Sequence, residues 1–174
     1  MTGSPTRFSS LVYLAAAVAA FAVLAATAGP AAAHTQDGVY KQRGHIRKRA
    51  LSQIGAPYKY GGTSASGFDC SGFTRWTFQD HGAALPHSSL KQYQLASKDS
   101  FKRVKKRKNL RVGDLVFHKT TSAKVGHAGV YIGKGRFVSA TSSNGVRVRS
   151  IWDSSYWGPR WVAGTRVPAT RHNS

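Results

Sequence analysis

The sequence predicts an α+β fold, in which N-terminal helices pack on a central antiparallel β-sheet. Two observations support this prediction. Apolar residues at helical spacing are confined to the first half of the chain. From residue 113 onward, short β-prone runs alternate with Gly, Ser or Asn turns. A series of helices followed by a series of strands is typical of α+β folds.

The first 33 residues have the composition of an export signal. Arg7 supplies a positive charge, residues 11–28 form an uncharged apolar run, and three alanines precede His34. We therefore expect a signal peptide that is cleaved after Ala33, and a secreted protein. The alternative is an uncleaved membrane anchor, because an apolar run of 18 residues is borderline for spanning a bilayer.

The rest of the chain is long enough for one domain with a sizeable core. Residues 34–43 are polar and are predicted to be a flexible segment, and the folded domain is predicted to cover residues 44–170. A helix is expected at 44–54, where apolar residues recur every four positions until Gly and Pro end the pattern.

Two further helices and five strands are predicted. Asp69 is a plausible N-cap for a helix at 70–80, after a loop at 63–69, and a short helix fits residues 88–96. The predicted strands cover residues 113–118, 127–133, 135–140, 145–150 and 160–167.

The composition limits the chemistry that the chain can perform. There are 26 Lys and Arg, six acidic residues, all Asp, and a formal net charge of +20. Six scattered Asp are a poor source for a paired-carboxylate glycosidase or for an oxygen-rich metal cage. The sequence has no H-E-x-x-H motif, Cys/His zinc cluster or phosphate-binding loop. We therefore expect no metal and no cofactor, and catalysis that relies on Cys and His.

Cys70 is the only cysteine in the chain. It would lie in the first turn of the predicted helix at 70–80, where unpaired N–H groups and the helix dipole favour an anion such as a thiolate. The other interpretation is a buried cysteine that acts as a small apolar residue.

A thiol nucleophile needs a base, and His127 is the best candidate among seven histidines. It begins the strongest predicted strand and is flanked by the small residues Gly126, Ala128 and Gly129. These small neighbours would let the N-terminus of a packed helix approach its ring. A structural histidine is the alternative.

Five sequence blocks occur in an order that resembles the NlpC/P60 family of cell-wall cysteine peptidases. They are APYKYGG, FDCSGF, LPHSS, RVGDLVF and GHAGVYIGKGRFVSA, and the resemblance spans roughly residues 44–167. It implies a papain-like α+β fold and a catalytic role for the predicted domain.

The resemblance also implies roles for individual residues. Cys70 matches the nucleophile and His127 the general base, while Tyr58 matches a tyrosine that supports the oxyanion and the substrate. Asp69 and Ser71 match positions that meet the free amino end of a stem peptide.

One position departs from the family pattern. The third polar residue, which orients the imidazole, is commonly His, Glu, Asn or Gln in the family, and here it is Ser139. A serine hydroxyl is short and neutral and would orient the imidazole weakly or through water. Lower activity or an altered substrate is therefore an open alternative.

The function that the resemblance implies is an endopeptidase acting on peptidoglycan stem peptides, at the D-γ-glutamyl-diaminopimelate bond. We expect the protein to be a monomer. The alternatives are a papain-like amidase or acyltransferase, and a weakly active or non-catalytic wall-binding module.

Two basic clusters, at 41–49 and 98–111, give far more charge than solubility requires. They predict partners among anionic cell-wall polymers or membrane surfaces, and wall association of the secreted protein. No motif for specific nucleic-acid binding is present.

Overall fold

The computed structural model describes residue 1, residues 30–98 and residues 100–168. Most of the predicted signal peptide, together with residues 169 and 170 at the end of the predicted domain, lies outside the described residues.

The structure has three helices, a small hairpin and a six-stranded sheet among its described residues. The helices are α1 (Pro30–Ser52), α2 (Cys70–Phe78) and α3 (Ser89–Gln94), with 3₁₀ turns at Gln79–His81, Leu95–Ser97 and Arg107–Asn109. The hairpin pairs β1 (Thr63–Ser64) with β2 (Gly67–Phe68). The sheet strands are β3 (Lys102–Val104), β4 (Leu115–His118), β5 (His127–Gly133), β6 (Arg136–Thr141), β7 (Gly145–Ser150) and β8 (Trp161–Arg166).

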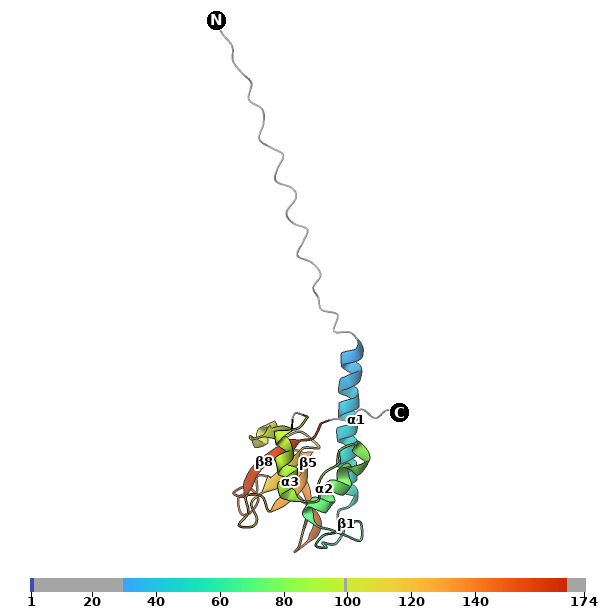
Figure 1. Ribbon diagram of the computed structural model, residues 1–174, viewed down its shortest axis with the longest axis vertical. Helices are drawn as coiled ribbons and strands as arrows, with labels where there is room; N and C mark the ends of the chain where they lie inside the picture. The colour runs from blue at the N-terminus through green and yellow to red at the C-terminus, as the bar shows by residue number, and fades with distance from the viewer. Residues whose placement is uncertain (2–29, 99, 169–174) are drawn as a thin grey trace.

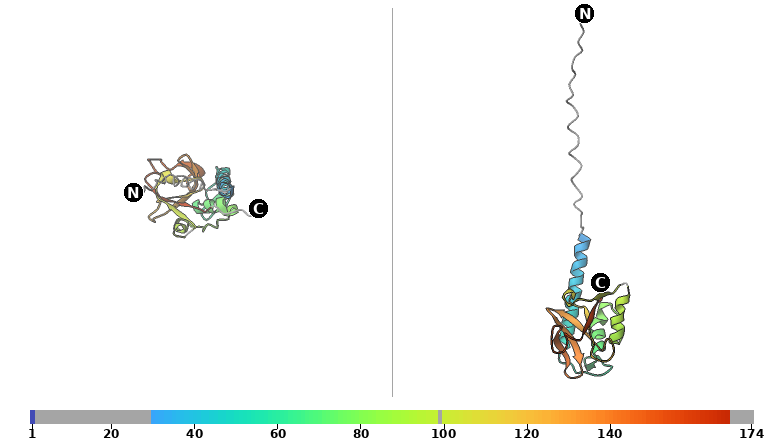
Figure 2. Two further views of the ribbon diagram at one scale, coloured as in Figure 1. Left: turned by 90° about the horizontal axis from the view of Figure 1, so that it is seen from above. Right: turned by 90° about the vertical axis from the view of Figure 1, so that its left-hand side faces the viewer.

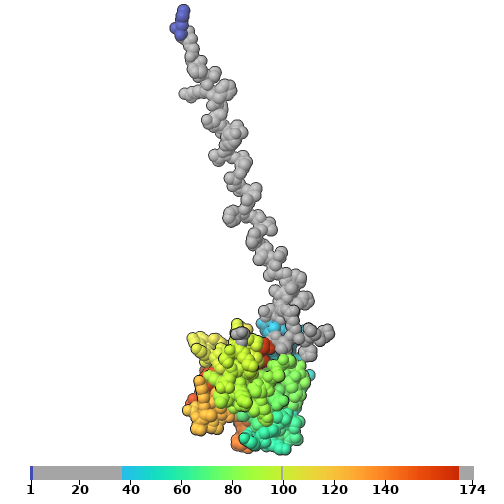
Figure 3. Space-filling view, in the orientation of Figure 1, coloured from blue at the N-terminus to red at the C-terminus, as the bar shows by residue number. Residues whose placement is uncertain are grey.

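The six-stranded sheet has the order β3-β8-β4-β5-β6-β7, and all of its neighbouring strands are antiparallel. Helix α2 packs on β5 and β6, and α3 packs on β8. The views in Figures 1 and 2 show this arrangement as a helical layer beside the sheet. Figure 3 shows the helical side of the molecule in a space-filling view. The predicted α+β class is confirmed.

Each face of the sheet has its own apolar cluster, because side chains alternate along a strand. The face toward α2 carries Ala128 and Val130 of β5, packed with Phe68 and Phe73. The opposite face carries Val116, Tyr131, Phe137, Ile151 and Trp157. His127 belongs by alternation to this second face, so it stands at the end of a strand whose other face contacts α2.

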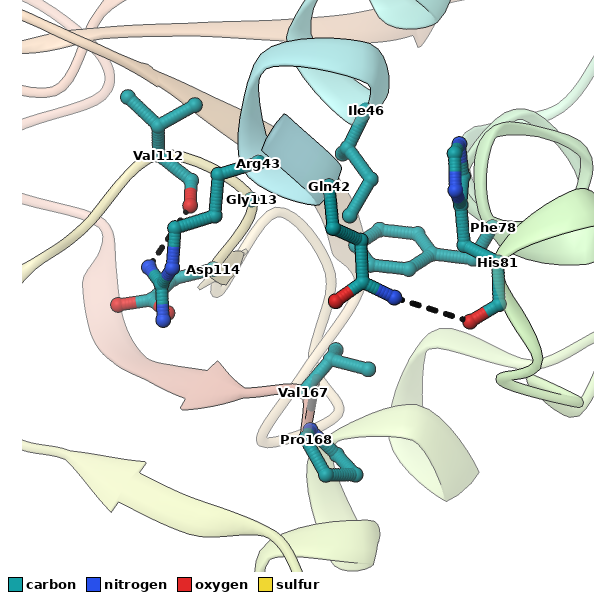
Figure 4. Close-up of a pocket in the computed structure, with 10 residues that line it drawn as sticks. All are labelled: Gln42, Arg43, Ile46, Phe78, His81, Val112, Gly113, Asp114, Val167 and Pro168. Atoms are coloured by element: carbon teal, nitrogen blue, oxygen red, sulfur yellow. Dashed lines mark hydrogen bonds between the residues drawn. The ribbon is translucent and has the colours of Figure 1, made fainter. Parts of the chain in front are cut away.

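Helix α1 runs through residues 34–43, for which the sequence predicted a flexible segment. Tertiary contacts hold its C-terminal half: Arg43 donates to the carbonyl of Val112 at 2.9 Å, and Gln42 donates to the carbonyl of His81 at 3.3 Å. Figure 4 shows both contacts around a pocket of about 10 Å³, which is too small for an organic ligand. Among the described residues, no helix has the length and apolar character needed to cross a membrane.

The other predicted elements are confirmed with small shifts at their ends. Gly82 ends the turn after α2 with φ 67°, a left-handed conformation that glycine adopts without strain. Two features were missed. Residues 63–69, predicted to be a loop, include β1 and β2, and the basic segment 98–111 includes β3. These strands are two or three residues long, which is too short for a periodic pattern.

Candidate active site

Asp69 begins helix α2 as its N-cap, as the sequence predicts. Its backbone is extended, with φ −88° and ψ 175°, and its carboxylate accepts from the N–H of Gly72 at 2.7 Å. Residue 70 is therefore the first helical residue, and its side chain stands at the helix N-terminus. Gly72 cannot be replaced easily, because a Cβ there would lie 2.0 Å from the carbonyl oxygen of Gly62.

The Cys70 thiol is held in a desolvated position. Burial raises the pKa of this thiol above its ordinary value, and the N–H groups of Ala128, Ser71 and Cys70 itself act in the opposite direction. The Ala128 contact joins the helix N-terminus to the strand residue that follows His127. The result is a protonated thiol in the resting protein, although the sequence favoured a thiolate at this position.

His127 lies at the start of β5 and is 7% exposed. Burial, with a smaller contribution from the charge of Arg149, lowers the pKa of its imidazole to about 4. The ring of Trp157 packs over it, with centroids 4.9 Å apart. The imidazole is therefore neutral at pH 7 and available as a base.

Tyr58, Cys70 and His127 line one cleft of about 540 Å³. Other lining residues are Asn144 and Arg149 near β7, and Tyr156 and Trp157 in the loop before β8. An isolated bridge between Tyr58 and Phe68, close to the start of α2, positions the tyrosine. The structure thus brings together three of the six predicted site residues at a cavity large enough for a peptide.

Ser139 lies on β6 and is completely buried. Its Oγ and the Nε2 of His127 both lack a hydrogen-bond partner among the described residues, so no hydrogen bond joins the two. Gly129, two residues after His127 on β5, packs against Ser139, since an added Cβ would be 3.1 Å from the Ser139 Cβ. The structure therefore provides no direct orienting bond from the third predicted residue.

His118 and Arg149, which the sequence did not predict as site residues, both lie near His127. His118 pairs with His127 across β4 and β5, and its ring stacks on Phe137 at 5.0 Å. Arg149 lines the cleft and donates to the side chain of Asn144 at 2.9 Å. The signal for His118 was present in the sequence: a polar residue closes the buried strand LVFH.

Asp69 and Ser71, the remaining predicted residues, are not among the residues that line the cleft. The hydroxyl of Ser71 donates to Asp69 at 2.9 Å, and the Nε2 of His87 lies 2.8 Å from the same carboxylate. Partial burial acts to raise the pKa of the Asp69 carboxyl, but the hydrogen bonds from the Gly72 N–H, Ser71 and His87 together lower it.

A cysteine at the N-terminus of a helix packed on an antiparallel sheet, with a histidine at the start of a facing strand, defines the papain-like class of folds. The sequence matches the NlpC/P60 family over residues 55–166, and the chain belongs to this family. The resemblance derived from the five sequence blocks is confirmed.

Two curated bacterial relatives show the extent of the similarity. The murein DD-endopeptidase MepS/murein LD-carboxypeptidase of Escherichia coli K12 is 39% identical over 127 residues, which cover 70% of this chain and 63% of that protein. The probable peptidoglycan endopeptidase LytE of Bacillus subtilis is 37% identical over 117 residues, which cover 67% of this chain and 32% of that protein. The chain therefore spans less than two thirds of these relatives.

Solved structures confirm the papain-like NlpC/P60 fold. The NlpC/P60 domain of the peptidoglycan hydrolase SagA superposes with a TM-score of 0.58 at 26% identity, covering 72% of this chain and 98% of that one. The peptidoglycan hydrolase RipB of Mycobacterium tuberculosis gives a TM-score of 0.62 at 26% identity, covering 82% of this chain and 73% of that one.

Proposed function

We propose that this protein is a cysteine endopeptidase that hydrolyses peptidoglycan stem peptides, at the D-γ-glutamyl-diaminopimelate bond. The observation that carries the proposal is the single cleft shared by Tyr58, Cys70 and His127. The names of the relatives, which include murein and peptidoglycan endopeptidases, supply the substrate class.

The protonation states define how the reaction starts. Burial raises the pKa of Cys70 and lowers that of His127, so the two cleft residues rest as a neutral thiol and a neutral imidazole. His127 therefore acts as a general base, which takes the thiol proton as the sulfur attacks the substrate carbonyl. A preformed thiolate–imidazolium pair is not required.

The remaining steps return that proton and regenerate the thiol. The N–H groups at the start of α2 and the hydroxyl of Tyr58 stabilise the oxyanion. The C–N bond then breaks, the imidazolium protonates the leaving amine, and a thioester remains on Cys70. Water, deprotonated by His127, attacks the thioester carbonyl, and the released sulfur recovers a proton from the imidazolium.

Digestion of purified peptidoglycan, followed by mass analysis of the products, tests this proposal. We expect new amino ends within stem peptides for the wild type and none for Cys70→Ala, which should keep its fold and its binding to the wall. Cleavage by Cys70→Ala would show that the mechanism is wrong. Release of whole stem peptides would indicate an amidase, and binding without products would indicate a non-catalytic module.

We also propose that the protein is exported and retained at the cell wall. Mass analysis of the protein recovered from culture medium and wall fractions tests the export step, and the expected mature chain begins at His34. A chain that keeps residues 1–33 at the membrane would indicate an anchor.

Wall retention is supported by the different exposure of the lysines and arginines in the basic segment 98–111. Its lysines at 102, 105, 106 and 108 are exposed. Two of its three arginines are partly buried: Arg103 packs on the Tyr93 ring at 3.5 Å, and Arg107 donates to the carbonyl of Gly158. The exposed lysines are thus available to bind anionic polymers, while Arg103 and Arg107 hold the segment against the domain.

Replacing these four lysines with Gln should weaken wall binding and reduce its dependence on salt. The matched control is Lys134→Gln with Arg136→Gln, two exposed residues at the turn between β5 and β6, compared with Lys105→Gln with Lys106→Gln so that each variant loses two charges. Equal loss of binding in both variants would indicate a general charge effect.

A further inference from the structure

Five buried side-chain atoms lack a hydrogen-bond partner among the described residues, and all of them belong to His127 or to residues around it. They are both ring nitrogens of His118, the Nε2 of His127, the Oγ of Ser139 and the Nε of Arg149. Buried polar atoms in folded proteins are almost always satisfied, either by protein groups or by ordered water. Unsatisfied atoms gathered at one place therefore indicate a water that several of them share.

The sheet places these side chains on one face. His118 is the register partner of His127 across β4 and β5, and Ser139 packs against Gly129, two positions after His127. Residues two apart on a strand share a face, so His127 and Gly129 lie on the face of Tyr131, which belongs to the second apolar cluster. The unpartnered atoms are thus surrounded by apolar side chains, where a missing hydrogen bond is costly.

The ring of His118 is completely buried and is fixed by three aromatic rings. It stacks on Phe137 at 5.0 Å, and it lies 5.1 Å from Trp157 and 5.9 Å from Trp161. Burial lowers the pKa of its imidazole to about 3, so the ring is neutral at pH 7. A neutral imidazole has one donor and one acceptor nitrogen, and aromatic packing uses neither of them.

The separation of the two histidine rings fits a bridging water. Their centroids are 6.4 Å apart, and no hydrogen bond joins their nitrogens. A direct bond would require nitrogens about 3 Å apart, and longer separations between polar atoms are commonly bridged by water. His127 lines the cleft, but its Nε2 is buried, so this nitrogen is turned away from solvent.

We propose that His118 is the positioning residue that orients His127, through one buried water that accepts from the Nε2–H of His127 and donates to the acceptor nitrogen of His118. The inference rests on the proposed function and assigns a role that Ser139 does not fill by a direct bond. A hydrogen held on Nε2 leaves Nδ1 as the nitrogen that takes the thiol proton of Cys70. When His127 becomes an imidazolium, the same bond becomes charge-assisted and stabilises it.

His118→Phe tests this role, because a phenyl ring keeps the aromatic packing and removes both nitrogens. We expect kcat to fall roughly 10- to 100-fold with little change in KM, the effect of one hydrogen bond to a charged group. His81→Phe is the matched control, since His81 is also buried and lies in the turn after α2, at the end opposite Cys70. This variant should keep the wild-type kcat. An unchanged kcat in His118→Phe would overturn the proposal.

Conservative variants separate hydrogen bonding from packing. His118→Asn and His118→Gln each keep a donor and an acceptor, placed near the positions of the ring Nδ1 and Nε2 respectively. At least one of them should retain a kcat about tenfold above that of His118→Phe, because the water keeps its partner. Losses in both that equal the loss in His118→Phe would show that the ring acts only by packing. Thermal unfolding of each variant accompanies the kinetics.

Nitrogen-15 NMR of the imidazole rings tests the inference without substrate. In the wild type we expect the His127 ring to carry its hydrogen on Nε2, and we expect this hydrogen to exchange slowly with solvent. In His118→Phe the exchange should be faster. A wild-type ring with its hydrogen on Nδ1 would overturn the proposal even if no variant of His118 folds. If the wild type cleaves neither stem peptides nor peptidoglycan, the proposed function is wrong, and the position of this hydrogen still decides the role of His118.

Discussion

His118 and His127 face each other across β4 and β5 as paired residues, with ring centroids 6.4 Å apart. Trp157 covers both rings, at 5.1 Å from His118 and 4.9 Å from His127. Neither nitrogen of His118 has a hydrogen-bond partner among the described residues. Burial, then the charges of His127 and Arg107, lower the pKa of His118 to about 3.

This pair predicts a loss of stability in mild acid. Both histidines have folded-state pKa values, about 3 and about 4, below the ordinary 6.5. The unfolded chain therefore binds more protons as the pH falls below 6.5, and the stability that is complete above that pH is lost toward pH 4. Each histidine should cost about 2 kcal/mol of unfolding free energy between pH 7.5 and pH 5.

His118→Phe should remove about half of this acid-dependent loss, because a phenyl ring fills the same aromatic site and does not titrate. Urea unfolding of the wild type and the variant at pH 7.5 and pH 5 measures the difference. Equal losses in the two proteins would show that His118 does not remain neutral in the folded state.

Ser139→Ala should leave kcat within about threefold of the wild type and raise the unfolding free energy by about 1 kcal/mol. The Ser139 hydroxyl is buried without a partner, which costs free energy that alanine avoids. Unfolding curves and peptidoglycan digestion measure both effects. Thr77→Val is a suitable control, because it removes a hydroxyl that donates to the Phe73 carbonyl at 2.8 Å. A large loss of kcat in Ser139→Ala would show that Ser139 does orient the His127 imidazole.

The sequence predicted the fold well where local patterns and tertiary packing agree. Helix α2 shows this agreement, since Asp69 is both a favourable N-cap by residue type and the cap in the structure. The part of α1 that covers residues 34–43 shows the limit. Its polar residues indicated a loose segment, but contacts of Gln42 and Arg43 with residues far along the chain accompany a helix there.

The candidate site was predictable to the extent that each residue can be recognised from its own neighbours. The cysteine, the tyrosine and the strand-initial histidine share one cleft. The hydrogen bonds of the Asp69 carboxylate could not be predicted. One of them involves His87, a side chain 18 positions away whose location Gln92 and Ser88 determine. The missing bond between Ser139 and His127 also depends on the sheet geometry.

The reactivity of Cys70 should increase with pH beyond the range of an ordinary thiol. Burial raises its pKa, so little thiolate exists at neutral pH without substrate. Alkylation by iodoacetamide, followed by mass analysis from pH 6 to pH 10, measures the titration of this single cysteine. A midpoint below that of free cysteine would instead indicate a preformed thiolate and would contradict the general-base mechanism.

Tyr58→Phe should lower kcat by roughly 10- to 100-fold while KM changes little, because an oxyanion donor acts in the transition state. Burial, followed by the charges of Cys70 and Asp69, raises the pKa of the Tyr58 hydroxyl, so it remains a donor over the working pH range. Tyr60→Phe is the matched control, since Tyr60 is 90% exposed and does not line the cleft. Steady-state kinetics on one peptide substrate, with thermal unfolding of both variants, makes the comparison. If Tyr58→Phe raises KM and leaves kcat unchanged, the hydroxyl binds substrate in the ground state and the oxyanion is stabilised by the N–H groups of α2 alone.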